Sequence, residues 1–153
     1  MEKEDKELLI KDLCGRFPYK VMCEISDGKT TITEVLKIGG LSGILNDTLR
    51  VKPYLRSISK MTEEEWEDWK SKFKMPLGAG VSSKSFKVYN YVVSSFGYTV
   101  DISLNEIADM IAWLNSHYFD FRGLIEKGLA LEAPETMYVH FEDMKTDIEV
   151  TKK

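Results

Sequence analysis

The spacing of hydrophobic and polar positions changes along the chain, and each spacing predicts a type of element. In residues 3–15 the apolar positions fall on one helical face with lysines and acids opposite them, which predicts a helix. Residues 19–26 instead alternate between apolar and polar positions, which is typical of a half-buried strand. Asp27-Gly28 is a strong hairpin signal, so the β-branched residues 30–38 are predicted to form the return strand.

Glycines and turn residues divide the chain after this hairpin into two more short segments. The apolar run 41–45 follows a pair of glycines, and the stretch 49–55 has the composition of an extended segment. Together with the hairpin, these segments predict a small antiparallel β-meander of three or four strands over residues 19–57. By analogy with other small sheets, an SH3-like barrel is one way in which such a meander closes.

Two capping boxes mark the starts of later helices. Thr62–Glu65 has the Ser/Thr-x-x-Glu pattern and precedes a predicted helix at 63–74. Ser103–Glu106 has the same pattern and precedes a predicted helix at 104–116. The first of these helices carries an aromatic stripe made of Trp66, Trp69 and Phe73. Such stripes usually supply core contacts, so we expect this stripe to pack against the sheet, with a partner-binding surface as the alternative.

The remaining segments are shorter or less regular. Residues 86–100 have apolar positions at helical spacing, but their β-branched and aromatic content favours a strand. Residues 123–131 have the pattern of a short amphipathic helix, and residues 137–141 alternate like a final strand. The sequence therefore predicts an α+β fold made of an N-terminal helix, a small antiparallel β-meander and a mainly helical C-terminal part.

The length of 153 residues favours a single domain. The glycine-containing loop at 75–85 is the predicted linker if the chain instead divides into parts at 1–74 and 86–153. A hydrophobic content of 43% excludes a wholly disordered chain. The charged N-terminus lacks the apolar core of a secretory signal, and no long apolar window predicts a membrane span, so the cytoplasm is the expected location.

The two cysteines are Cys14 and Cys23, and both are expected to be buried free thiols. A disulfide would require an oxidising compartment, which nothing in the sequence indicates. His117 and His140 do not combine with the cysteines in the paired spacing of a zinc site. The sequence therefore predicts no metal site and no cofactor.

Charge is distributed unevenly along the chain. The net charge is −2 over residues 1–47, +4 over 48–87 and −6 over 88–153, which gives −4 in total. Cations with interleaved aromatic rings can bind nucleic acid, because cations attract phosphates and rings stack on bases. The candidates in the basic segment 50–87 are Arg50, Lys52, Tyr54, Arg56 and Lys60. Five acids also lie in this segment and the pI is near 5.3, so a mixed solvated surface is the alternative.

One dense group of polar and aromatic residues could carry chemistry or contact a partner. It consists of Trp113, His117, Tyr118, Asp120 and Arg122. His117 and Asp120 are three residues apart, and a histidine held by a carboxylate is the minimal general-base unit. The sequence assigns no nucleophile to this pair, however. The structural alternative is that Asp120 caps the element that follows and Arg122 pairs with a carboxylate.

Three blocks of the sequence are similar to parts of known small proteins. They are WLNSHYFDFRGLIEKGLALEAPETMY at 113–138, VKPYLRSISKMTEEE at 51–65 and LLIKDLCGRFPY at 8–19. In these blocks the chain resembles a family of small proteins of gut-anaerobe bacteria, which are often associated with prophages and other mobile elements. The resemblance implies a phage-like setting and no catalytic residue, and the segment 75–103 fits it poorly.

Three functions remain in view from the sequence. The first is a non-enzymatic protein-interaction module, with an unidentified protein or a second copy of the chain as partner. The second is a nucleic-acid-binding protein that uses the basic segment 50–87. The third is an enzyme that uses His117 and Asp120.

Overall fold

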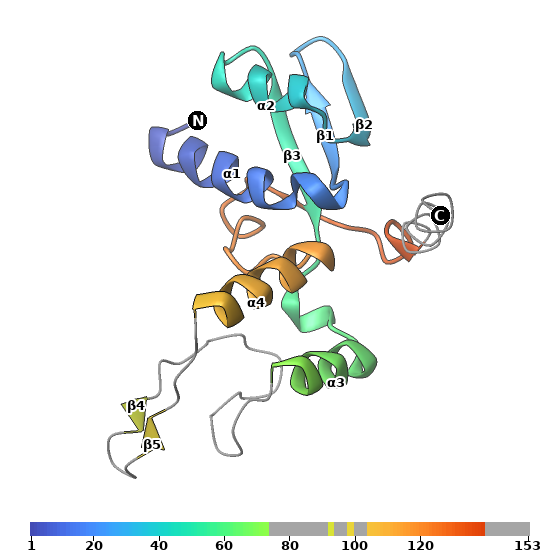
Figure 1. Cartoon of the computed structure of the whole chain (residues 1–153). Helices are drawn as coiled ribbons and strands as arrows, with labels where there is room; N and C mark the ends of the chain where they lie inside the picture. Colours follow the sequence, from blue (N-terminus) through green and yellow to red (C-terminus); the bar gives the residue numbers. More distant parts are fainter. Residues whose placement is uncertain (74–91, 94–97, 100–103, 140–153) are drawn as a thin grey trace, which may run out of the picture.

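The computed structural model of the chain describes residues 1–73, 92–93, 98–99 and 104–139 (Figure 1). The predicted linker 75–85 and the cap residue Ser103 lie outside these ranges. Within the predicted segment 86–100, Val92–Val93 and Tyr98–Thr99 pair as antiparallel strands, which agrees with the strand prediction for these residues.

The described helices and strands follow in this order: α1 (Lys3–Arg16), η1 (Phe17–Tyr19), β1 (Met22–Ser26), β2 (Thr31–Val35), α2 (Ile38–Leu45), β3 (Arg50–Leu55), η2 (Ile58–Lys60), α3 (Glu63–Lys72), β4 (Val92–Val93), β5 (Tyr98–Thr99), α4 (Leu104–Ser116) and β6 (Leu131–Glu132). This order confirms the α+β class with an N-terminal helix, a small sheet and further helices. The capping box at Thr62 is also confirmed, because both of its reciprocal hydrogen bonds are present.

The strand order of the main sheet differs from that of a meander. The sheet has the order β2-β1-β3-β6, in which β1 pairs antiparallel with both of its neighbours and β6 pairs parallel with β3. The inner strands are thus β1 and β3, and the chain leaves β2 through α2 to return as β3 on the other side of β1. Among the described strands, β2 and β6 are the two edges of an open sheet, which differs from the SH3-like barrel of the prediction.

Helix α2, which connects β2 to β3, lies where the sequence predicted an extended segment. Its buried positions are Gly40, Gly43 and Ile44, which lie on one helical face. A Cβ added at Gly43 would lie 2.4 Å from Cδ1 of Leu49, so glycine is needed where the helix meets the chain leading to β3. Three glycines within eight residues lower the helix propensity, which explains why the local pattern did not predict this helix.

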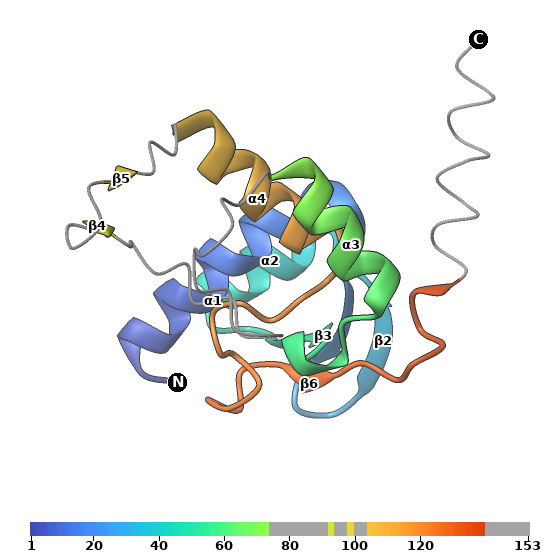
Figure 2. The same ribbon diagram turned by 90° about the horizontal axis from the view of Figure 1, so that it is seen from below.

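Two hydrophobic clusters fill the interior. The larger one joins the sheet to α1 and α2, and in both views these helices lie on the same side of β1 and β3 (Figures 1 and 2). The smaller one joins α3 to α4 around Trp69, Trp113 and Phe119. The aromatic stripe of α3 therefore packs against α4, whereas the sequence predicted that it packs against the sheet.

The segment after α4 corrects two sequence predictions. The predicted helix 123–131 is a series of turns that buries Leu124 and Leu129, and Gly123 and Gly128 have φ of 72° and 70° there. Met137 and Tyr138 of the predicted strand 137–141 lie in a turn, and the described strand of this region is β6. In both segments the apolar residues pack against residues that are distant in the sequence. Their spacing therefore does not indicate a helix or a strand.

The two cysteines differ in their surroundings. Cys23 is buried on β1, and burial raises the pKa of its thiol to about 12. Cys14 is exposed on α1, which corrects the expectation that both thiols are buried. Within the described ranges, no helix combines the length and the apolar composition that crossing a membrane requires.

This difference predicts selective thiol labelling. At mildly alkaline pH, a maleimide is expected to modify Cys14 within minutes and to leave Cys23 unmodified, because only a thiolate in contact with solvent reacts. Mass spectrometry of native and denatured protein measures the difference, and Cys14→Ser is the control that should abolish native labelling. Modification of Cys23 in the native protein at a similar rate would contradict the buried environment.

Candidate functional site

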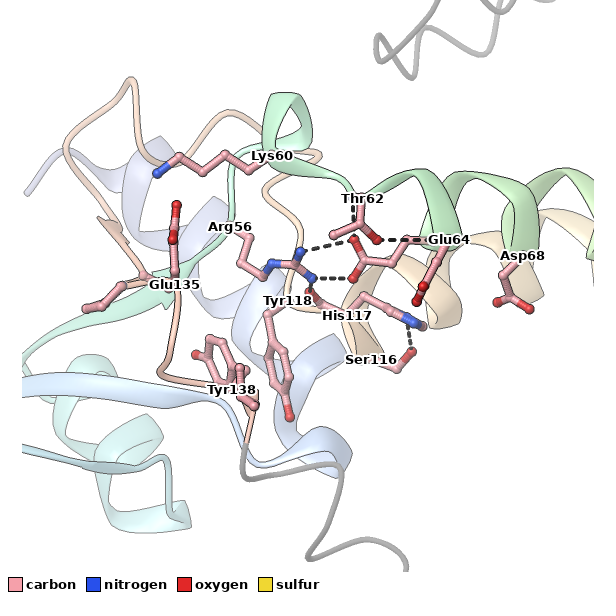
Figure 3. Close-up of a pocket in the computed structure, with 14 residues that line it drawn as sticks. Arg56, Lys60, Thr62, Glu64, Asp68, Ser116, His117, Tyr118, Glu135 and Tyr138 are labelled. Atoms are coloured by element: carbon pink, nitrogen blue, oxygen red, sulfur yellow. Dashed lines mark hydrogen bonds and ion pairs between the residues drawn. The ribbon is translucent and has the colours of Figure 1, made fainter.

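A pocket lies where the loop after β3, the start of α3, the end of α4 and the segment after β6 meet (Figure 3). Its volume is about 790 Å³. Its lining residues are Arg56, Lys60, Thr62, Glu64, Glu65, Asp68, Ser116, His117, Tyr118, Ala133, Pro134, Glu135, Tyr138 and Val139. Three separate stretches of the chain, 56–68, 116–118 and 133–139, supply these residues, so the pocket exists only in the folded protein.

Arg56 is the central cation of this pocket, and its guanidinium makes three hydrogen bonds. Its Nη1 and Nη2 donate to the two carboxylate oxygens of Glu65 at 2.7 and 3.0 Å, and Nη1 also donates to the carbonyl of His117 at 3.2 Å. The guanidinium carbon lies 4.5 Å from the ring centroid of Phe119. Arg56 therefore joins β3, α3 and the end of α4, and it has little capacity left for an anionic ligand.

Glu65 serves the helix cap and the ion pair at the same time. Burial alone would raise the pKa of this carboxyl, but the hydrogen bonds from Arg56 and from the backbone N–H of Thr62 outweigh burial and lower it. The folded state therefore stabilises the charged form of the Glu65 carboxyl more than the unfolded chain does. The resulting stabilisation is present above the ordinary glutamate pKa and is lost as the pH falls through the lowered pKa of Glu65.

His117 lies at the end of α4 with its ring stacked on Trp113 at a centroid distance of 3.9 Å. Its Nδ1 lies 2.9 Å from the carbonyl oxygen of Trp113 and 3.0 Å from Oγ of Ser116. A carbonyl oxygen can only accept a hydrogen bond. We therefore assign the proton of the neutral His117 ring to Nδ1, which faces the carbonyl of Trp113. Nε2 is then the nitrogen whose protonation changes the charge of the ring.

Asp120, the carboxylate of the predicted pair with His117, has a capping role in the structure. Both carboxylate oxygens of Asp120 accept backbone N–H groups, those of Leu124 and Ile125, at 2.9 Å. Asp120 thus caps the turns that follow, as the structural alternative predicted. The hydroxyl of Ser116 donates to the Trp113 carbonyl at 2.8 Å, so the nearest hydroxyl is bonded to the backbone.

The other members of the predicted aromatic and polar surface are largely structural. Trp113 is 6% exposed and Tyr118 is 3% exposed, so neither side chain offers a surface of any size to a partner. Nε of Arg122 lies 3.5 Å from Oδ1 of Asp12, which confirms its pairing with a carboxylate. Of the five residues of this group, only His117 and Tyr118 line the pocket.

The residues predicted to bind nucleic acid fall into two places. Arg50, Lys52 and Tyr54 alternate with the buried residues of β3, so they share the face of the sheet opposite to α1 and α2. Arg56 and Lys60 line the pocket instead. Nζ of Lys60 lies 2.9 Å from Oε1 of Glu132, so both cations of the pocket already have carboxylate partners.

Carboxylates dominate the charge of the pocket. It is lined by four carboxylates and two cations, which gives a net charge of −2 with His117 neutral. Glu64 and Glu135 are exposed at the rim. The hydrogen bond from Nε1 of Trp113, at 2.9 Å, is the main cause that lowers the pKa of Asp68, so this carboxylate is charged at neutral pH.

Sequence reasoning missed Glu64, Asp68 and Glu135 as members of a site. The acids of α3 stabilise the start of the helix through its dipole and the capping box. This local role was sufficient to explain their presence, so the sequence offered no reason to place them in a site. Only the position of α3 against α4 shows that one side of the helix faces a cavity.

Within the described ranges, no three His, Cys, Asp or Glu side chains are placed to hold a metal ion together. Comparison of the chain with protein-family models, curated proteins and solved structures finds no match. The resemblance to small mobile-element proteins therefore stays a prediction, and the function has to be argued from the geometry alone.

Proposed function

We propose that the chain is a non-enzymatic interaction module whose pocket binds a lysine or arginine side chain of a partner protein. The observation that carries this proposal is the excess of carboxylates in a pocket whose own cations are already paired. A partner cation that enters the pocket meets Glu64 and Glu135, which lie on either side of Arg56 in the view of Figure 3.

The apolar part of the pocket suits the same ligand. Tyr118 and Tyr138 line the pocket, but both are buried and stack on each other at a centroid distance of 3.6 Å. The aliphatic stem of a lysine or arginine therefore packs on the exposed Pro134 and Val139 of the same lining, while its charged head reaches the carboxylates. An acidic ligand would instead have to displace the carboxylate of Glu65 from Arg56, which is costly for a half-buried bidentate pair.

An NMR titration tests this proposal with a defined probe. N-acetyl-arginine methylamide is expected to shift the backbone amides of Glu64, His117 and Glu135 in the labelled full chain, and N-acetyl-aspartate methylamide is expected to leave them in place. The double variant Glu64→Gln/Glu135→Gln should weaken the arginine probe by about threefold to tenfold, because each half-exposed ion pair contributes up to about 1 kcal/mol.

The matched control is Glu63→Gln/Glu67→Gln, which removes the same charge from α3 outside the pocket lining. Equal weakening in both double variants would show a general charge effect and would overturn the pocket. A short oligothymidylate serves as the probe for the second candidate function. Shifts confined to Arg50, Lys52 and Tyr54 on adding it would favour nucleic-acid binding at the face of the sheet opposite to α1 and α2.

A further inference from the structure

The strand β2 forms an edge of the main sheet and has an unusual composition for an exposed edge. Among the described strands it pairs only with β1. Four of its five residues are β-branched, and Ile32 is 51% exposed. Exposed edge strands are usually protected by charged side chains, above all lysine, by proline or by a bulge, because their free backbone groups can pair with another strand. β2 contains no lysine, proline or bulge, and its one charged residue, Glu34, is paired with Lys37 of the same chain.

The pairing of β2 with β1 determines which backbone groups of β2 point away from the sheet. The N–H of Asp27 donates to the carbonyl of Thr30, and the N–H of Leu36 donates to the carbonyl of Val21. In an antiparallel ladder, hydrogen-bonded pairs alternate with pairs that are not hydrogen-bonded. Along β2, residues whose backbone groups bond to β1 therefore alternate with residues whose backbone groups point away from β1. The backbone N–H and C=O groups of Thr31, Thr33 and Val35 point outward at the edge.

An exposed apolar rim lies on one side of this edge. Ile32 pairs with the buried Ile25, and a Cβ on Gly40 of α2 would lie 3.8 Å from Cδ1 of Ile25. Ile32 is thus on the side of the sheet that α2 covers. Two residues of α2 that are seven positions apart, Ile38 and Leu45, are 75% and 58% exposed on one face of the helix. A strand added next to β2 would cover Ile32 and lie beside this helix.

We propose that the occupant of this edge is a second copy of the chain, whose β2 pairs antiparallel with β2 around a two-fold axis at Ile32. A two-fold axis perpendicular to the sheet keeps the helix-covered sides of both copies together and makes the two surfaces identical. The arrangement joins two four-stranded sheets into a continuous sheet of eight strands. The outward groups of Thr31 then bond to those of Thr33 of the partner subunit.

The side chains select this register among those that the backbone allows. Centring on Ile32 places it opposite Ile32 of the partner subunit in a pair that is not hydrogen-bonded, where side chains come closest. It also pairs Thr31 with the partner's Thr33, and such threonine pairs stabilise antiparallel strands. Centring on Thr33 would place Ile32 opposite the partner's Glu34, and centring on Glu34 would place two carboxylates opposite each other. Of these three registers, the one centred on Ile32 is thus the one in which β2 is complementary to itself.

Sedimentation velocity over a wide range of concentrations tests the association. The full chain is expected to pass from monomer to dimer in the micromolar range, because the strand and its rim form a small interface. Ile32→Lys should weaken the dimer by at least about tenfold, since it places two like charges opposite each other. The matched control Ile107→Lys changes an isoleucine that is 40% exposed on α4 and should leave the dimer intact. A monomer at all concentrations would overturn the proposal.

Disulfide trapping tests the register. In a Cys14→Ser background, Ile32→Cys is expected to form a covalent dimer under mild oxidation, because Cα atoms in such a pair are about 4.5 Å apart, within the disulfide range. Thr31→Cys and Thr33→Cys should each trap poorly alone and well when the two variants are mixed. Cys23 does not interfere, because it is buried. Efficient trapping of Thr33→Cys with itself, and none of Ile32→Cys, would overturn the register.

Discussion

Replacing Asp12 by alanine is expected to destabilise the fold by about 3–5 kcal/mol, because it leaves a buried arginine without its counter-charge. Asp12 and Arg16 lie one turn apart on α1, and both side chains are 0% exposed. Nε and Nη2 of Arg16 donate to the two oxygens of Asp12 at 2.7 and 3.0 Å. Nη2 of Arg16 also donates to the carbonyl of Phe119 at 2.7 Å, which ties α1 to the chain after α4.

A second cation increases the dependence on Asp12. Nε of Arg122 lies 3.5 Å from Oδ1 of the same carboxylate. Loss of Asp12 therefore leaves two guanidinium groups close together without their carboxylate partner. Urea denaturation followed by circular dichroism measures the loss of the free energy of unfolding.

Two further variants separate the buried charge from a general effect on α1. Asp5→Ala removes a partly exposed acid of the same helix, which lies 3.8 Å from Lys127, and should cost less than about 1 kcal/mol. The double variant Asp12→Leu/Arg16→Met removes both charges and should recover most of the stability lost in Asp12→Ala. A loss in Asp12→Ala no larger than that in Asp5→Ala would contradict this role.

Elements with strong local signals could be predicted from the sequence. The Asp27-Gly28 turn joins β1 to β2, and the carboxylate of Asp27 accepts the N–H groups of Lys29 and Thr30 at 2.8 Å. The capping box at Thr62 starts α3 for a similar reason. In both places a side chain satisfies backbone groups a few residues away, so the energy that specifies the element lies within one short window.

Features that depend on distant contacts could not be predicted. Asp12 and Arg16 have the spacing of an ordinary surface ion pair on a helix, and only the carbonyl of Phe119, more than a hundred residues away in sequence, shows that the pair is buried. The short strand β6 pairs with β3 through only two residue pairs, which no local periodicity indicates. The pocket has the same character, because its acids and its aromatic wall come from separate parts of the chain.

The second large effect is expected at Trp69, the residue that joins α3 to the rest of the fold. Its side chain is 1% exposed, and its ring centroid lies 5.2 Å from that of Trp113 and 4.4 Å from that of Phe73. Trp69→Ala should cost about 3–5 kcal/mol, since it opens a cavity between two helices that cannot both collapse into it. Near-ultraviolet circular dichroism should also lose intensity, because the two indole rings interact in an edge-to-face arrangement.

Trp66 on the same helix provides the matched control. It is half-buried beside the same cluster, and Nζ of Lys70 lies 5.6 Å from its ring. Trp66→Ala should therefore reduce the free energy of unfolding less than half as much as Trp69→Ala, although the two substitutions remove the same atoms. Equal losses of stability in the two variants would show that α3 is not anchored mainly through Trp69.

Trp69→Ala should also affect the pocket. Asp68 neighbours Trp69 and accepts the hydrogen bond of Trp113, so this variant should bind the arginine probe more weakly.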